Sequence, residues 1–245
     1  MESYLYDEFY QVERTHWWFA GMRGIFLDFV EPEFKRWARP RFLDIGCGTG
    51  IVLEEFRNRA SVCGIDVSER ALLYARRRNE ETPLLLGSVL DIPLTSECVE
   101  IAAALDVIEH VEDDMAGLRE IWRVLRPGGA VLINVPAFES LWSEKDDANH
   151  HYRRYRRAGL RRVLENSGFR IERISYTNAT LFPAIWFARQ VGNVVGRPWN
   201  SRAEYHPARA VNSTLLGVLH FERALLKRTN LPLGTSITCL ARRPS

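Results

Sequence analysis

Short apolar runs alternate with longer amphipathic segments between residues 41 and 135 of this 245-residue chain. The apolar runs predict five strands, at 41–45, 62–65, 84–86, 101–105 and 130–135. Segments with helical spacing lie between them, at 51–59, 68–79 and 115–125. Strands that alternate with helices predict a parallel sheet with helices on both faces, which is an α/β fold.

The rhythm changes after residue 136. Residues 137–157 are polar and aromatic without clear periodicity, which is typical of a functional loop. A helix is predicted next, followed by two alternating strand patterns at 169–176 and 236–241. The residues between these strands, 177–234, are too many for an unstructured loop in a compact domain, so we expect helices there, most clearly at 211–227.

The length suits one domain over residues 1–245 better than two domains. Within it we expect N-terminal lid helices, a ligand-binding core, a substrate loop and a helical insertion, at 1–34, 35–136, 137–157 and 177–234. The net charge of +2 gives no sign of a nucleic-acid partner, and the four scattered cysteines predict neither a zinc site nor disulfides. The start of the chain lacks the pattern of a signal peptide, and no apolar run is long enough for a membrane span, so a cytoplasmic protein is predicted.

A glycine-rich turn follows the first predicted strand. Asp44 is succeeded by Gly46, Gly48 and Gly50, and a helix begins directly after them. Glycines allow a tight turn and bring the backbone close to a bound molecule. Asp66 ends the second strand, and its carboxylate there can accept hydrogen bonds from both hydroxyls of a ribose.

These features also occur in dinucleotide-binding oxidoreductases, but the glycine spacing argues against that class. The dinucleotide fingerprint needs a third glycine or alanine where this chain has Ile51. A sulfonium cofactor has no phosphate to bind and gains from a nearby carboxylate such as Asp44.

Five segments resemble, in order, the motifs of class I S-adenosylmethionine-dependent methyltransferases. They are the turn at 42–50, the acidic motif at 64–66, the segments at 87–93 and 105–110, and the Arg-Pro-Gly-Gly at 126–129. The resemblance implies S-adenosyl-L-methionine as cofactor and a Rossmann-like seven-stranded sheet whose sixth and seventh strands form an antiparallel pair. It implies cofactor contacts from Asp44, Gly46, Gly48, Gly50, Asp66, Val67, Asp91, Ile92 and Leu105.

The flanks are similar to a bacterial subgroup of these enzymes, through a His-Trp-Trp-Phe segment at 16–19 and a His-x-Arg-Arg-Tyr loop at 151–155. In that fold both flanks usually close over the active site. Trp17 and Trp18 then form an apolar lid, or else they only anchor the N-terminal helix. In the loop, His151, Arg154 and Tyr155 are expected to bind substrate, with the arginine suited to a carboxylate or phosphate; a solvated polar face is the alternative.

His110 is the candidate general base, because it follows the fourth strand, where the resemblance places the acceptor, and because imidazole titrates near neutral pH. A hydrogen bond to a lid residue is its alternative role. Asp106, Glu109 and His110 could also hold a metal ion, but neighbouring side chains rarely converge and no further ligand is evident, so no metal is predicted.

The predicted function is methyl transfer to a small-molecule, glycan or lipid-linked acceptor, with an oxygen atom favoured. A cofactor-binding regulator without catalysis is the alternative. The insertion carries a net charge of +5 beside many apolar residues. It is expected to form a helical cap or a subunit contact; a peripheral membrane contact through 178–228, at the inner face, is the alternative.

Overall fold

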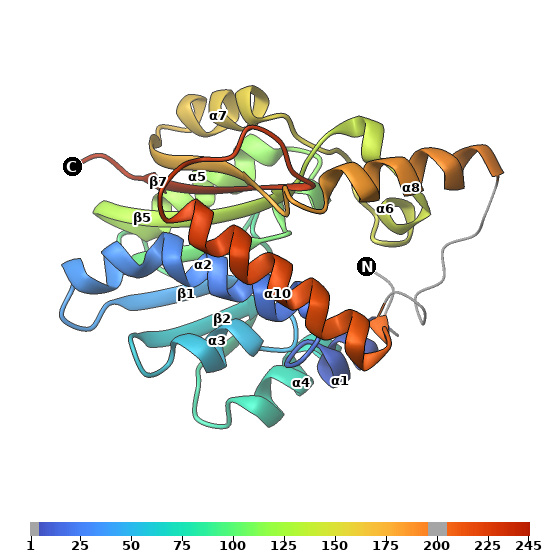
Figure 1. The fold of residues 1–245 in the computed structure, drawn as a ribbon. Helices are drawn as coiled ribbons and strands as arrows, with labels where there is room; N and C mark the ends of the chain where they lie inside the picture. Colours follow the sequence, from blue (N-terminus) through green and yellow to red (C-terminus); the bar gives the residue numbers. More distant parts are fainter. Residues whose placement is uncertain (1–4, 196–204) are drawn as a thin grey trace.

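The computed structural model describes residues 5–195 and 205–245, and it contains one seven-stranded sheet (Figure 1). The strand order is β3-β2-β1-β4-β5-β7-β6. Strand β7 pairs antiparallel with both β5 and β6, and the other neighbouring strands are parallel. The predicted Rossmann-like sheet with an antiparallel final pair is confirmed. The strands are β1 (Arg41–Ile45), β2 (Ser61–Asp66), β3 (Leu84–Leu86), β4 (Val99–Leu105), β5 (Leu125–Pro136), β6 (Arg170–Thr177) and β7 (Ser236–Arg242).

Helices precede, connect and follow these strands. They are α1 (Leu5–Val12), α2 (Trp17–Arg36), α3 (Ile51–Phe56), α4 (Glu69–Arg78), α5 (Asp114–Val124), α6 (Glu144–Ala148), α7 (Arg157–Asn166), α8 (Phe182–Val195) and α10 (Arg209–Leu226), with 3-10 turns η1 (Ile108–His110) and η2 (Glu139–Leu141). Residues 1–4 and 196–204, which include three charged residues of the predicted insertion, lie outside the described residues.

Two element ends differ from the sequence prediction by three residues or more, and the other ends by two or fewer. The fifth strand begins at Leu125 rather than 130, because Leu125 already pairs with Val99 and the ladder resumes at Ala130 after a register shift. The Pro-Gly-Gly segment at 127–129 therefore lies inside the strand rather than only stopping the helix before it. The helix after the glycine turn ends at Phe56, three residues earlier than expected, and continues as a turn.

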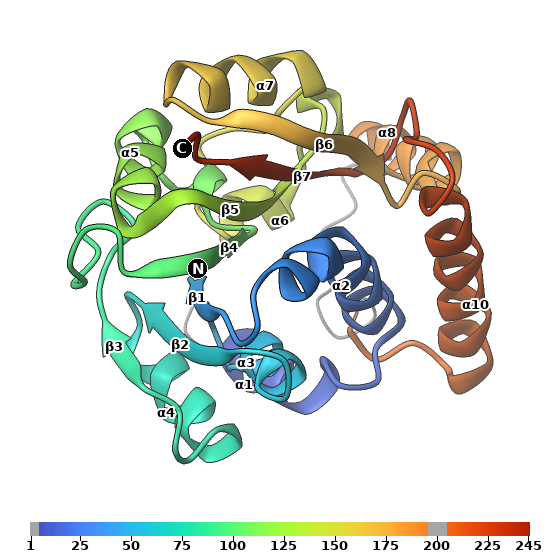
Figure 2. The same ribbon diagram turned by 90° about the vertical axis from the view of Figure 1, so that its left-hand side faces the viewer.

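The sheet is buried on both faces, as β4 shows residue by residue. Ile101 and Ala103 belong to a core shared with α2, α3 and α10, whereas Ala102 and Ala104 face a core shared with α5 and α7. Alternate side chains of a strand point to opposite faces, so a strand covered twice is apolar throughout. Figure 2 shows α5 and α7 on one side of the sheet and α2 and α10 on the other.

The last helix of the insertion packs on α2. Leu219 of α10 is fully buried and lies so close to Gly21 that a Cβ there would come within 2.4 Å of it. Arg223 donates two hydrogen bonds of 2.7 Å to Asp28, and the Lys227 ammonium lies 3.4 Å from the same carboxylate. This part of the insertion is a cap, and two of its basic residues are engaged by the domain itself.

A membrane span is not found in the structure: none of the helices over residues 5–195 and 205–245 combines the length and the hydropathy that crossing a bilayer requires.

Leu219→Ala tests whether the cap is part of the folding unit. Removing this fully buried side chain should lower the free energy of unfolding by about 2–5 kcal/mol, because the cavity between α10 and α2 cannot close completely. Val211→Ala, at a half-exposed position of the same helix, should change it by less than about 0.5 kcal/mol. Urea denaturation measures both. Equal, small effects would mean that α10 does not stabilise the domain.

Candidate active site

A cavity of about 900 Å³ opens beside the carboxyl ends of β1 and β4. The strand order reverses at this pair, since β2 lies on one side of β1 and β4 on the other. Such a switch point leaves a crevice in which ligands of α/β sheets bind. The lining comes from the glycine turn, α1, α2, η1, the segment around α6, and α8.

The glycine turn has a backbone that side chains would prevent. Gly46 has a φ of +68°, and a Cβ on it would lie 2.5 Å from the Val107 side chain. Gly48 also has a positive φ, of +53°, but a Cβ there would meet nothing within 4 Å. Gly48 therefore borders open space in the cavity, where a ligand can approach the backbone.

Asp44 lies in the cavity wall with its carboxylate buried. Its Oδ2 is inaccessible to solvent and has no hydrogen-bond partner among the described residues. Burial, together with the nearby Asp66 carboxylate, raises the pKa of Asp44 to about 8. Burying an unpaired carboxylate is costly, and a cationic ligand would offset that cost.

Asp66 and the glycine turn hold each other in position. Its two carboxylate oxygens accept hydrogen bonds from the Gly48 amide at 2.8 Å and the Ser68 amide at 2.9 Å. Burial raises its pKa. Asp66 does not line the cavity itself, but these bonds place it directly behind Gly48 at the end of β2.

Apolar side chains are exposed where β2 and β3 end. Val67 is 70% exposed, Leu86 is 54% exposed and Leu90 is 48% exposed. Gly87 donates to the Asp66 carbonyl, which keeps the two strand ends adjacent. Three exposed apolar side chains at these strand ends could pack against a flat apolar ring. Of the two residues predicted nearby, Asp91 is exposed, whereas Ile92 is buried in the core, and its backbone N–H and carbonyl are already bound to Glu120 and Arg123.

The N-terminal segment is tied to the glycine turn by buried charge. Glu13 accepts a hydrogen bond from Thr49 of the turn and lies 2.9 Å from Arg78 of α4. Arg78 also donates to the Tyr10 carbonyl and stacks on the Tyr10 ring. Removing either partner of a buried ion pair is strongly destabilising, so this pair fixes α1 over the turn.

The predicted lid tryptophans line the cavity. Trp17 and Trp18 begin α2, and the Trp17 amide donates to Asn212 of α10 at 2.9 Å. The next residue, Phe19, also lines the cavity and packs against Phe9 and Tyr205. All three rings thus border the cavity, and the contacts of Phe19 also anchor the segment.

Asp106 directly follows β4, and its backbone lies in the left-handed region, with a φ of +55°. Its Oδ1 accepts from Asn134 of β5 at 2.8 Å, and Asn134 in turn accepts from the Thr238 hydroxyl of β7 at 2.9 Å. Asn134 and Thr238 are fully buried, so the chain of bonds through the sheet fixes the carboxylate. Burial raises the pKa of Asp106.

Glu109 and His110 follow in η1 and both line the cavity. The Glu109 carboxylate is fully buried, and neither of its oxygens has a partner among the described residues. Burial, and then the Asp106 charge, raise its pKa. Burial, and then the charge of His151, lower the pKa of His110 to about 4, so the imidazole is neutral at neutral pH.

The segment after β5 brings His151 against His110, with ring centroids 4.6 Å apart. The His151 Nδ1 lies 2.9 Å from a carboxylate oxygen of Asp146, a fully buried residue of α6. Arg154 donates to both oxygens of Asp146, at 2.8 and 3.0 Å. The pKa of Asp146 is lowered to about 2, because the bonds from His151 and Arg154 outweigh the effect of burial.

Two of the predicted substrate-binding residues have structural contacts instead. Arg154 lines the cavity, but its guanidinium is engaged by Asp146 and the Ala137 carbonyl, so it does not offer a free fork for a substrate anion. Tyr155 lies outside the cavity lining, and its hydroxyl donates to Asp114 at 2.8 Å. Its amide and carbonyl pair with Pro136 and Phe138, which fixes the path of the loop.

Several cavity residues were not predicted as ligand groups from the sequence. Arg23 of α2 lines the cavity, and its Nε is buried without a partner among the described residues. Asp146 fell inside a charged run whose members could not be ranked. The sequence signal for Arg23 was the resemblance of the N-terminal segment to the bacterial subgroup, which includes this residue but assigns it no role.

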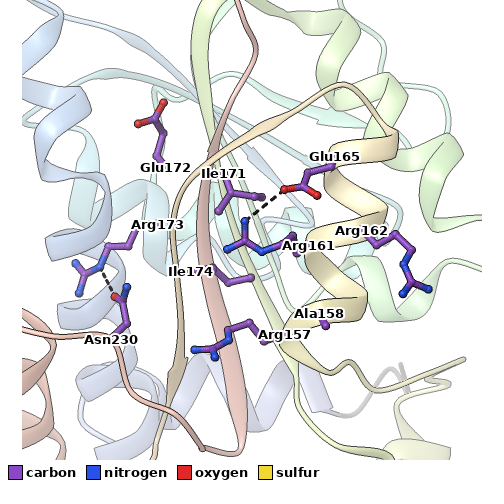
Figure 3. A pocket seen from close by; sticks show the side chains of 10 residues that line it. All are labelled: Arg157, Ala158, Arg161, Arg162, Glu165, Ile171, Glu172, Arg173, Ile174 and Asn230. Carbon is purple, nitrogen blue, oxygen red and sulfur yellow. Dashed lines mark hydrogen bonds and ion pairs between the residues drawn. The ribbon is translucent and has the colours of Figure 1, made fainter.

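A second hollow, of about 580 Å³, lies on the outer face between α7 and β6 (Figure 3). Two of its four arginines have side-chain hydrogen-bond partners: Arg161 pairs with Glu165, and Arg173 donates to Asn230. None of the predicted site residues lines it. The chemistry therefore concentrates in the cavity at the glycine turn.

The part of the chain that holds the glycine turn is similar to known sequences. A family model described as a methyltransferase domain matches residues 43–133, from β1 to β5. A Mycolicibacterium smegmatis protein named a probable S-adenosylmethionine-dependent methyltransferase is 31% identical over 133 residues, which is 53% of this chain and 52% of that protein. The malonyl-[acyl-carrier protein] O-methyltransferase of Serratia marcescens is 33% identical over 117 residues, which is 45% of this chain and 46% of that enzyme.

The ubiquinone biosynthesis O-methyltransferase of Pseudomonas aeruginosa is 35% identical over 107 residues, which is 40% of this chain and 44% of that enzyme. The chain thus spans about half the length of the curated relatives that it matches.

Solved structures share the fold over almost the whole chain. An S-adenosylmethionine-dependent methyltransferase of Thermotoga maritima superposes with a TM-score of 0.58 at 17% identity, covering 97% of this chain and 94% of that one. A [4+2]-cyclase superposes with a TM-score of 0.56 at 19% identity, covering 89% and 81%. Such likeness shows the fold alone, and the fold supports more than one reaction.

The raised pKa of Asp44 predicts how the stability of the ligand-free protein depends on pH. An unfolded aspartate titrates near a pKa of about 3.9, and the folded one near about 8, so the folded state holds the extra proton between these values. The free energy of unfolding should therefore fall as pH rises through this window, by at most about 1.4 kcal/mol per pH unit. Asp44→Asn should flatten the slope in urea denaturation. Parallel slopes would show that Asp44 titrates normally.

Proposed function

We propose that the chain is an S-adenosylmethionine-dependent methyltransferase that acts on an acceptor in the cavity beside the glycine turn. The unpartnered carboxylate of Asp44 in the cavity wall carries this proposal, since it suits a cationic ligand. The match of residues 43–133 to a methyltransferase domain supports it.

The residues present fit this cofactor. Gly48 borders open space, and Asp66 behind it can exchange a backbone bond for a ribose hydroxyl. The exposed Val67, Leu86 and Leu90 offer an apolar surface for the adenine ring. At the other end, the partnerless Nε of Arg23 can donate to the cofactor's carboxylate. Leu105, at the end of β4, lines the cavity between the turn and η1.

When bound, the cofactor supplies an electrophilic methyl group on a sulfonium sulfur. The chain's own residues orient the acceptor and exclude water: Trp17 and Trp18 close one side of the cavity, and the segment with His151 closes another. Methyl transfer depends mainly on such positioning. His110 is the group proposed to take up the acceptor's proton as general base. Its pKa of about 4 leaves the imidazole unprotonated at neutral pH but makes it a weaker base than the sequence argument assumed, since that argument rested on an imidazole that titrates near neutral pH.

An oxygen atom is the proposed acceptor, because a hydroxyl must lose its proton on methylation and His110 borders the cavity to take it. Two relatives whose names specify O-methylation support the same atom. The acceptor classes are a small molecule, a glycan or a lipid-linked compound. A peripheral membrane contact through 178–228 stays a prediction, for which the exposed Trp186, Phe187 and Phe221 are the apolar groups on the described helices.

A cofactor-binding protein without methyl transfer is the second candidate, because a [4+2]-cyclase shares the fold. The two candidates share the turn and Asp66, and they differ in whether η1 acts on an acceptor. Turnover of a labelled methyl group separates them.

Asp66→Ala tests the cofactor site. Losing the carboxylate should weaken S-adenosylmethionine binding by about 1.5–3 kcal/mol, the range for hydrogen bonds to a charged group. Isothermal titration calorimetry measures this, and NAD should bind far more weakly than S-adenosylmethionine. Asp113→Ala is the matched control, because Asp113 also accepts a backbone amide bond, at the start of α5, whereas Asp66 accepts one from Gly48 of the glycine turn. Unchanged affinity in a folded Asp66→Ala protein would place the ribose elsewhere.

His110→Ala tests the acceptor side. Turnover should fall roughly 10²- to 10⁴-fold, the usual contribution of general acid–base catalysis, while cofactor affinity changes little. His220→Ala, on the exposed side of α10, removes an imidazole outside the cavity lining and should leave turnover unchanged. Transfer of a labelled methyl group to acceptor fractions measures both. Near-normal turnover of His110→Ala would leave this residue a packing role.

A further inference from the structure

We propose that Glu109, His110 and His151 bind a divalent first-row transition metal ion. The proposal rests on the proposed function and refines the role of His110. In it, the cation that His110 helps to hold would lower the pKa of the acceptor's hydroxyl, and the proton would leave to solvent water rather than to His110.

The three side chains converge from two separate segments. Glu109 and His110 lie in η1, and His151 comes from the segment after α6, 41 residues later in the chain. One ligand atom from each lies within 4.8 Å of the others. Ligands about 2.0–2.2 Å from a tetrahedral ion are roughly 3.3 Å apart, so small side-chain rotations complete the site. The sequence argument against a metal fails here, because the ligand it lacked is His151.

Glu109 is the observation that points to a ligand independently of this spacing. It is fully buried, and neither carboxylate oxygen has a hydrogen-bond partner among the described residues. A buried carboxylate without any partner is costly, whereas a coordinated cation would satisfy both its charge and its lone pairs. A bound ion would thus explain why the Glu109 carboxylate is buried without a hydrogen-bond partner among the described residues.

The surroundings of the histidines are those of metal ligands. The Nδ1 of His151 is bound by Asp146, which leaves its Nε2 for the ion and forms the carboxylate–histidine pair that orients many metal-binding imidazoles. Arg154 holds Asp146 with two hydrogen bonds and neutralises it. The backbone of Asn149 and His150 lies close to the His110 ring.

The ligand types indicate the class of ion and its use. Two imidazoles and one carboxylate suit zinc, manganese or cobalt better than magnesium, which prefers oxygen ligands. Three protein ligands leave coordination positions open, as in catalytic sites. All three ligands line the cavity, so an oxygen of the acceptor can reach an open position. Asp106, next to this group, adds negative charge that favours a cation.

Cobalt(II) is the probe for the test, because its visible spectrum reports ligand number and type. The full chain, treated with a chelator and dialysed, is titrated with Co²⁺ and followed by absorption and calorimetry. We expect one ion per chain with nitrogen ligation. Glu109→Gln and His151→Ala should each weaken binding at least tenfold. Asp146→Asn, which only orients His151, should weaken it by about 10–100-fold. His220→Ala is the control and should bind as the wild type does.

Cofactor affinity and methyl transfer are measured on the same samples. Absence of a Co²⁺ signal from the folded wild type overturns the metal site, as does binding that survives both ligand substitutions. If S-adenosylmethionine still binds and its methyl group is still transferred after chelation, only the metal proposal fails. If the cofactor does not bind whether or not Co²⁺ is present, the proposed function itself fails.

Discussion

The buried carboxylate of Asp44 is the constraint from which the rest of the site follows. It lies at the switch point between β1 and β4, where the crevice forms, and no protein group among the described residues satisfies its Oδ2. The sheet holds it there, because β1 pairs with strands on both sides and is covered on both faces. In the free protein the raised pKa lets a proton neutralise this group, and a positively charged ligand, such as a sulfonium cofactor with an ammonium group, would stabilise its ionised form instead. The glycine turn gives such a ligand access to the same place.

The site has two parts with different chemistry. Where β2 and β3 end, outside the cavity lining, Asp66 and exposed apolar side chains suit a nucleoside. Toward β5 and the following segment the cavity wall offers Glu109, His110 and His151, backed by Asp146 and by the polar chain through Asn134. The two parts meet at the ends of β1 and β4, so a group transferred from one ligand to the other would cross there. The N-terminal segment closes over this meeting point through the ion pair of Glu13 with Arg78.

The sequence predicts the parts of the structure that local patterns determine. The five strands of the core and the glycine turn follow from periodicity and from glycine's access to positive φ, and Ser68 caps α4 as its side chain allows. Contacts between distant segments were not predictable in this way. The local sequence does not show that Glu13 pairs with Arg78, or that Asp146 binds the guanidinium of Arg154. The charged residues around each of them offer many equivalent partners. For the same reason Tyr155 was expected to bind substrate, although its hydroxyl is directed to Asp114.

Proton release on cofactor binding directly tests whether the cation of the cofactor stabilises the ionised carboxylate of Asp44. If the cation of S-adenosylmethionine offsets the buried charge of Asp44, binding must lower a pKa that is about 8 in the free protein. Calorimetric titrations at pH 7, in two buffers with different ionisation enthalpies, should then show release of about one proton per cofactor bound, and Asp44→Asn should abolish it. Tight binding of S-adenosylmethionine by the wild type without proton release would contradict the account.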